Sequence, residues 1–203
     1  MRLSRRLGTP KLPFWSFSIK MGYMDAVKWL ENHRNFFSPE MNGYSNVPIG
    51  PYLSTLPLID GNGKIIDSGC GNGMLLKFLI EFSGHSLIPF GIDLNEKAIA
   101  QASKEILSDY ADNFLVEDVK TYDFNEGPFD FIITNPFYAK PKMREFTEKC
   151  LKNLKVGGRL IYRVHDDVLK RNMINDLGEL PDFEGLGMKT IQGRGLIFGI
   201  FEK

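Results

Sequence analysis

Short apolar runs alternate with longer segments of helical periodicity along most of the chain. Runs of strand length end at Asp67, Asp93 and Asp118, and a fourth run covers residues 129–134. Between them, apolar residues recur three and four positions apart, as over residues 95–106, which is the spacing of one helix face. Alternating strands and helices of these lengths predict an α/β fold with a mainly parallel sheet. Asn95, at the start of that helical segment, is a favourable N-cap.

The C-terminal third continues this pattern and then changes it. A helical segment at residues 142–154 precedes the turn Gly157-Gly158, which leads into the next strand, and another helix is predicted after Asp166-Asp167. Two apolar runs, residues 188–192 and 195–201, then flank a short break at Gly193-Arg194, which predicts a β-hairpin. We therefore expect an antiparallel pair at one edge of the sheet.

The residues before the first strand form a separate region. Residues 1–20 contain five basic residues and no acid, which indicates a basic N-terminal arm or leader. Residues 25–37 have helical spacing, and the prolines and glycines of residues 42–61 predict a loop. We expect residues 21–60 to form a lid extension or a helix packed on the sheet, and residues 61–203 to form the main domain.

The segment after the first strand carries the main chemical signal, Asp67-Ser68-Gly69-Cys70-Gly71-Asn72-Gly73. Glycines allow a left-handed backbone and let a ligand approach the main chain. The helix that follows directs unpaired N–H groups toward an anion. A dinucleotide fingerprint needs glycine at its sixth position, where this chain has Met74. The loop therefore predicts a different cofactor site, with an ordinary strand–helix turn as the alternative.

The run Asp67-x-Gly69-x-Gly71-x-Gly73 resembles the first motif of the class I S-adenosylmethionine-dependent methyltransferases, and the later acids and Gly157-Gly158 follow in the family's order. The resemblance covers roughly residues 60–203. It implies a Rossmann-like, three-layer α/β/α fold with a seven-stranded, mostly parallel sheet and an antiparallel C-terminal hairpin. It also implies S-adenosyl-L-methionine as the cofactor. The residues it assigns to cofactor binding are Asp67, Gly69, Cys70, Gly71, Gly73, Asp93, Leu94, Asp118 and Val119.

The family gives roles to some of these residues. The acid at Asp93 accepts hydrogen bonds from the two ribose hydroxyls, and the acid at Asp118 lies near the adenine amino group with Val119 against the ring. Acids at strand ends are also common helix N-caps, and this remains the alternative for both. We expect Cys70 to be a small packed side chain beside the cofactor.

A second motif, Asn135-Pro136-Phe137-Tyr138, follows the fourth strand. It resembles the Asn-Pro-Pro-aromatic motif of methyltransferases that act on planar amino groups, with Phe137 in place of the second proline. The resemblance implies that the Asn135 oxygen and the Pro136 carbonyl accept the two N–H groups and that Tyr138 stacks on the acceptor. A structural turn is the alternative.

The predicted acceptor is an amino group of an RNA or DNA base or of a protein glutamine. A small-molecule acceptor, or a non-catalytic binding subunit with this fold, are the alternatives. The 25 basic and 25 acidic residues balance, so a nucleic-acid partner would need a local patch of charge.

Two cysteines without metal-ligand spacing predict no metal site and fit a reducing, cytoplasmic compartment. No apolar run approaches the length of a membrane span, so no membrane partner is expected.

Overall fold

The structure is a computed structural model that describes residues 19–135, 140–165, 189–192 and 196–203. The helical elements are α1 (Ile19–Asn32), η1 (Arg34–Phe36), α2 (Pro39–Asn42), α3 (Ile49–Thr55), η2 (Leu56–Leu58), α4 (Met74–Phe82), α5 (Glu96–Gln101), η3 (Ala102–Ile106), η4 (Ser108–Asn113) and α6 (Lys140–Lys152). The strands are β1 (Gly63–Ser68), β2 (Leu87–Asp93), β3 (Phe114–Val116), β4 (Phe129–Thr134), β5 (Leu154–His165), β6 (Lys189–Gln192) and β7 (Leu196–Glu202).

These strands form one sheet in the order β3-β2-β1-β4-β5-β7-β6. β1 lies between β2 and β4, and these pairs, like β2–β3 and β4–β5, are parallel. β7 is antiparallel to both β5 and β6. The predicted Rossmann-like α/β fold, with a mostly parallel sheet and an antiparallel C-terminal pair, is confirmed. In such a sheet the carboxyl ends of the parallel strands share one rim, where ligands bind.

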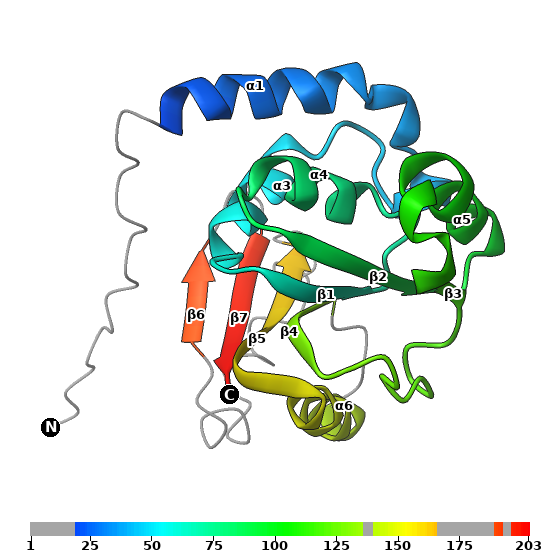
Figure 1. The fold of residues 1–203 in the computed structure, drawn as a ribbon, viewed down its shortest axis with the longest axis vertical. Coiled ribbons are helices and arrows are strands. Elements are labelled where there is room, and N and C mark those ends of the chain that lie inside the picture. The colour runs from blue at the N-terminus through cyan, green and yellow to red at the C-terminus, as the bar shows by residue number, and fades with distance from the viewer. Residues whose placement is uncertain (1–18, 136–139, 166–188, 193–195) are drawn as a thin grey trace, which may run out of the picture.

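Helices cover both faces of the sheet. Figure 1 shows α1, α3, α4 and α5 over one face and α6 under the other. Alternation along each strand supplies both cores, since Ile65 and Ile133 join the first apolar cluster while their neighbours Ile66 and Ile132 join the second. The arrangement is therefore three-layered, as predicted.

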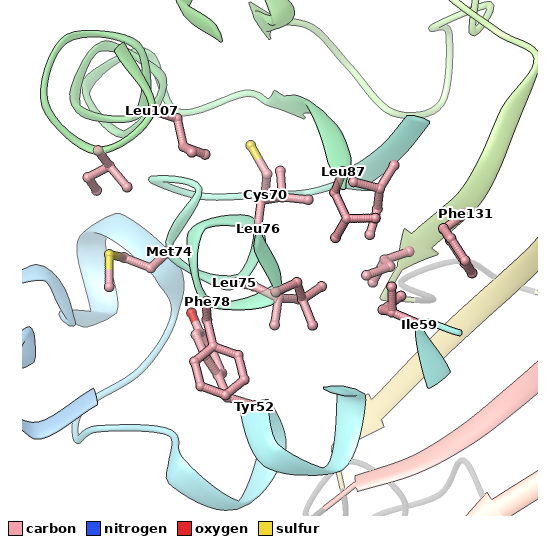
Figure 2. Packing of buried hydrophobic residues seen from close by; sticks show 14 of the residues in the cluster. Tyr52, Ile59, Cys70, Met74, Leu75, Leu76, Phe78, Leu87, Leu107 and Phe131 are labelled. Carbon is pink, nitrogen blue, oxygen red and sulfur yellow. The ribbon is translucent and has the colours of Figure 1, made fainter. Parts of the chain in front are cut away.

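The N-terminal extension packs directly on this framework. The Tyr52 ring of α3 lies 5.4 Å from the Phe78 ring of α4, and the Trp29 ring of α1 lies 5.9 Å from the same Phe78. Figure 2 shows Tyr52 and Phe78 side by side next to Leu75. Because these rings bury large apolar areas, they fix residues 19–58 against α4.

The structure differs from the sequence prediction mainly within this extension. Residues 42–61 were expected to form a loop, yet Ile49–Thr55 is helical and continues into Leu56–Leu58. Pro51 lies in the first turn of α3, where a backbone N–H has no helical partner to lose. The helix expected over residues 25–37 already includes residue 19 and ends at Asn32.

Two further boundaries differ. The helix expected at residues 142–154 is α6, Lys140–Lys152, and Leu154 instead opens β5. Gly157, expected in a turn before that strand, lies within β5 at φ 81°, beside a register shift against β4. The predicted cap of α5 is confirmed, because the Asn95 side chain accepts hydrogen bonds from the N–H groups of Lys97 and Ala98.

Three predictions fall on residues outside the described ranges. They are most of the basic arm, the helix after Asp166-Asp167, and the break at Gly193-Arg194.

Candidate active site

A cavity of about 460 Å³ opens at the carboxyl-end rim of the sheet. Its size is typical of sites for small molecules and cofactors. Strand alternation brings Asp67, Asn135 and Arg163 to the same face, because residues two positions before each belong to the first apolar cluster. The lining residues are Glu40, Met41, Asn42, Gly43, Tyr44, Tyr52, Asp67, Gly69, Cys70, Gly71, Leu75, Asp93, Asn95, Asn135 and Arg163.

The glycine loop turns between β1 and α4 with a left-handed backbone at Gly69 (φ 87°) and Gly71 (φ 54°). A Cβ at Gly69 would meet no atom within 4 Å, so this backbone is open to the cavity. A Cβ at Gly71 would instead collide with the Met41 carbonyl oxygen and lie 2.9 Å from the Asn42 Cα. The backbone at Gly69 is therefore open to the cavity, while the missing side chain of Gly71 admits the backbone of α2.

Asp93 ends β2 and organises the loop beside it. One carboxylate oxygen accepts the Gly71 N–H at 2.8 Å, and the other accepts the Asn95 N–H at 2.9 Å. An ionised carboxylate has about four acceptor positions, so two remain for a ligand. Asp93 thus holds the loop in place and still presents acceptors to the cavity.

Asp67 and Arg163 are charged side chains on the buried wall of the cavity, exposed by 3% and 4%. Burial raises the pKa of Asp67 to about 7, with Arg163 opposing the shift and Asp93 adding to it. Burial acts to lower the pKa of Arg163, but the oxygens of Tyr44, Asp67 and Tyr52 outweigh it and raise that pKa. Arg163 is therefore a cation at any ordinary pH, whereas Asp67 titrates near neutrality.

Asn135 lies one residue beyond β4, between the ends of β1 and β5. Its Oδ1 is buried, and among the described residues it has no hydrogen-bond partner. A buried acceptor without a donor is unfavourable, so a polar ligand group is the expected partner. Pro136 and Tyr138, predicted to act with Asn135, lie outside the described residues.

Cys70 lies under the loop, 5% exposed, with its thiol 3.3 Å from the Gly71 carbonyl oxygen. Burial raises the pKa of this thiol well above its ordinary value. The side chain is thus a protonated, packed group at the cavity wall.

Four residues assigned to the cofactor are not part of the cavity lining. Gly73 begins α4, and a Cβ there would press against Leu107 and Phe114 at 3.3 Å. Leu94 is 66% exposed on the same rim. The Asp118 carboxylate accepts the Lys120 N–H at 2.9 Å in a local turn that no helix follows, so the helix-cap alternative does not hold either, and Val119 packs against the second apolar cluster.

Sequence reasoning did not identify Arg163, Tyr44 or Tyr52 as cavity residues. A signal for Arg163 was present, because it interrupts the otherwise apolar strand Leu160-Ile161-Tyr162-Arg163-Val164. A cation two positions after the buried Ile161 faces the same core, which marks it as a buried charge. Nothing comparable distinguishes Tyr44 from the other aromatic residues of the extension.

The chemistry of these groups fits S-adenosylmethionine. The open backbone at Gly69 and the free acceptor positions of Asp93 suit a nucleoside. Asp67 and Arg163 supply one acidic and one basic group in the same cavity, as the amino-acid end of that cofactor requires. Together the fold and the cavity define a class I methyltransferase.

The family model of the methyltransferase domain matches residues 59–186, and the chain therefore belongs to that family. Class I methyltransferases, the class to which this domain belongs, use S-adenosylmethionine as the methyl donor. Among curated proteins, the ribosomal RNA large subunit methyltransferase G of Colwellia psychrerythraea is 29% identical over 114 residues. The alignment covers 53% of this chain and 27% of that protein, so the chain spans about a quarter of the relative's length.

Solved structures show the same fold. A candidate S-adenosyl-L-methionine-dependent methyltransferase from Methanococcus maripaludis superposes with a TM-score of 0.59 at 16% identity, covering 94% of this chain and 97% of its own. TrmN from Thermus thermophilus gives a TM-score of 0.55 at 20% identity over 75% of this chain and 48% of its own. An rRNA methylase from Streptococcus thermophilus gives 0.53 at 19% identity over 75% and 93%.

Within the described ranges, no cluster of acidic, histidine and cysteine side chains is arranged to hold a metal ion. The helices described there also include none with the length and apolarity needed to cross a membrane.

Proposed function

We propose that this methyltransferase acts on the exocyclic amino group of an RNA base. The observation that carries the proposal is the buried Asn135 Oδ1, which lies in the cavity at the end of β4 and lacks a donor among the described residues. The curated relative, named a ribosomal RNA methyltransferase, supports RNA as the source of the base.

The chemistry of such an acceptor explains the need for an unpaired oxygen. An exocyclic amine conjugated to a ring is a weak nucleophile because its lone pair is delocalised into the ring. An acceptor that takes one of its N–H groups directs the lone pair toward the methyl donor. As positive charge grows on the nitrogen, this hydrogen bond strengthens, so Asn135 stabilises the transition state more than the bound substrate.

The motif extends this role to residues outside the described ranges. We assign the second N–H group to the Pro136 carbonyl and base stacking to Tyr138, which would contribute about 1–3 kcal/mol. S-adenosylmethionine supplies the methyl group on a positively charged sulfur. Direct transfer needs no protein nucleophile, consistent with the protonated, packed state of Cys70.

For the cofactor, we propose that Asp93 accepts the ribose hydroxyls and that Asp67 binds the α-ammonium group. Asp67 suits this role because it is 3% exposed and forms no ion pair within the described residues. A bound cation would then compensate the burial of its carboxylate.

We also propose that residues 39–52, here called the cover segment, close the cavity over the amino-acid end of the cofactor. The segment is held at several points. The Asn95 side chain donates to the Glu40 carbonyl at 2.6 Å, and Lys97 pairs with the Glu40 carboxylate at 3.0 Å. Asn42 and Asn72 are hydrogen-bonded at 3.2 Å.

The acceptor is tested by radiolabelled methyl transfer from S-adenosylmethionine into separated RNA, protein and small-molecule pools, followed by nucleoside analysis. We expect label in an N-methylated base. Asn135→Ala should lower transfer by roughly 100- to 1,000-fold while S-adenosylhomocysteine affinity changes by less than about threefold. Asn62→Ala, at the opposite rim where Asn62 accepts the Ser86 N–H, is the matched control.

Label in protein or in small molecules alone would reject the RNA acceptor. Full activity of Asn135→Ala on any pool would mean that the motif around Asn135 is only a structural turn.

A further inference from the structure

Arg163 is a buried cation that forms no ion pair at contact distance in the described part of the chain, although the Asp67 carboxyl interacts with it electrostatically. One terminal nitrogen donates to the Tyr44 hydroxyl at 3.1 Å, and Nε is buried without an acceptor. The residue is 4% exposed, yet it lines the cavity. A guanidinium offers five N–H donors in a rigid fork, and of these the buried Nε–H has no acceptor among the described residues.

The contrast with Arg159, four residues earlier on β5, makes this unusual. Arg159 pairs with Asp60 at 2.7 Å and with Glu202 at 3.2 Å, as a partly buried arginine is expected to do. Burying a charge without such a partner is unfavourable. The pKa of Arg163 is raised, so the side chain does not escape this cost by losing its proton. An anion entering the cavity is the missing partner.

Asp67 indicates which anion this is. Asp67 and Arg163 lie on the same face of the sheet, line the same cavity and interact electrostatically. A carboxylate that accepts a cation and a guanidinium that accepts an anion together match a zwitterion, the α-amino and α-carboxylate groups of an amino acid. The cofactor of this family carries such a group at its methionine end.

We propose that Arg163, oriented by Tyr44, binds the α-carboxylate of the methionine moiety of S-adenosylmethionine. The inference rests on the cofactor and on the proposed role of Asp67, and it does not depend on the acceptor. Tyr44 belongs to the cover segment, so its hydroxyl joins that segment to the carboxylate site through the guanidinium. Tyr44 is a positioning residue, and Arg163 is the ligand-binding residue.

The test compares two ligands by calorimetric titration of the full chain. They are S-adenosylhomocysteine and its decarboxylated form, which keeps the amine and lacks only the carboxylate. The unmodified protein should bind the first roughly 10- to 100-fold more tightly, the scale of charge-assisted hydrogen bonds to a carboxylate. This comparison requires no variant and therefore no assumption about folding.

Arg163→Met should then abolish the preference, because it loses affinity for S-adenosylhomocysteine and not for the decarboxylated ligand. Arg163→Lys should retain part of it, and Tyr44→Phe should reduce it by about two- to fivefold. Arg159→Met, on the same strand outside the cavity, should leave the ratio unchanged. If Arg163 had only a structural role, its replacement would weaken the binding of both ligands equally.

An unchanged preference in Arg163→Met would overturn the proposal and place the carboxylate elsewhere, such as the N-terminus of α4. An unchanged preference combined with weaker RNA binding would assign Arg163 to an acceptor phosphate instead. Neither outcome bears on Asn135, because both ligands are measured without an acceptor. Failure of this inference is thus distinguishable from failure of the proposed function.

Discussion

The two halves of the cavity are built in opposite ways. One half, around Gly69, Gly71, Asp93 and Asn95, uses residues within about 25 positions of one another, and its polar groups bond to one another, as when Asp93 accepts the N–H groups of Gly71 and Asn95. The other half draws on distant elements, for example the Arg163–Tyr44 pair separated by 119 positions. There, within the described residues, Asn135 Oδ1 and Arg163 Nε have no partner.

This difference indicates that one half is preorganised, whereas the other is completed by the ligand that it recognises. A half whose polar groups are already satisfied holds its shape before a ligand arrives. A half with buried unsatisfied groups is less stable by itself and gains most from a ligand that supplies the missing partners. Ligand specificity is therefore expected from the half that contains Asn135 and Arg163.

The largest effect expected from this comparison concerns Asp67, the buried acid of the unsatisfied half. Burial raises its pKa to about 7, well above the unfolded value. The stability contributed by its protonated form is complete below about pH 4 and is lost as the pH rises through 7. Asp67→Asn removes this titration. The free energy of unfolding of the variant, relative to that of the unmodified protein, should therefore rise by about 3–4 kcal/mol between pH 4 and pH 8.

Urea unfolding of both proteins at several pH values measures this difference. Subtracting the two curves cancels the other carboxylates, which titrate in both chains. Two curves that run parallel from pH 4 to pH 8 would show that Asp67 has an ordinary pKa.

A smaller effect is expected at Asn72, which joins the two halves. It is fully buried, donates to the Phe36 carbonyl and to the Gln101 side chain at 2.8 Å, and accepts from Asn42 at 3.2 Å. Asn72→Ala should lower the free energy of unfolding by about 2–3 kcal/mol, because several buried groups lose their partners.

Thermal or urea unfolding measures the loss at Asn72. Asn113→Ala is the control, since that half-buried side chain has one recorded bond, to the Pro89 carbonyl at 3.0 Å, and should cost about 1 kcal/mol. Equal losses in the two variants would mean that Asn72 does not act as a joint.

The smallest effect is expected at Asp93, in the satisfied half. Asp93→Asn keeps the size of the side chain but replaces one accepting oxygen by an NH2 group, so one of the two loop hydrogen bonds and part of the acceptor capacity are lost. S-adenosylhomocysteine affinity should therefore fall by roughly 10- to 30-fold. Asp118→Asn should change it by less than about threefold, because Asp118 caps a local turn and is absent from the cavity lining. Titration calorimetry of both variants ranks the two acids. A larger loss at Asp118 would restore its assignment to the adenine.

The fold was largely predictable because its signals are local. The acids at the ends of β1 and β2 and the cap of α5 follow from short sequence patterns. The helix α3 was not predictable, because prolines normally argue against a helix and Pro51 is tolerated only by its place in the first turn. Burial of Tyr52 against Phe78 stabilises that helix, and such a contact is invisible in a local window.

The residues of the site divide in the same way, into those marked by local sequence patterns and those placed by long-range packing. Asp67, Gly69, Cys70, Gly71, Asp93 and Asn135 all line the cavity, since the parallel sheet brings strand ends to one rim. Tyr44 and Tyr52 could not be placed without the packing of the N-terminal extension over that rim, whereas Arg163 could have been found from the charge that interrupts its apolar strand. Gly71 shows this difference most clearly. The sequence pattern correctly marks a position that must be glycine, but the atom that requires it is the Met41 carbonyl oxygen of the N-terminal extension and not a ligand.

The contact between Gly71 and Met41 also bears on what counts as the working unit of this enzyme. The shared family region starts at residue 59, whereas one wall of the cavity comes from residues 40–52. Transplanting the family region alone into another protein would carry the glycine loop and Asp93, but it would leave Tyr44 and Tyr52 behind. Arg163 would then lose its only recorded hydrogen bond within the described chain. The region matched by the family and the region that lines the cavity are thus different lengths of chain.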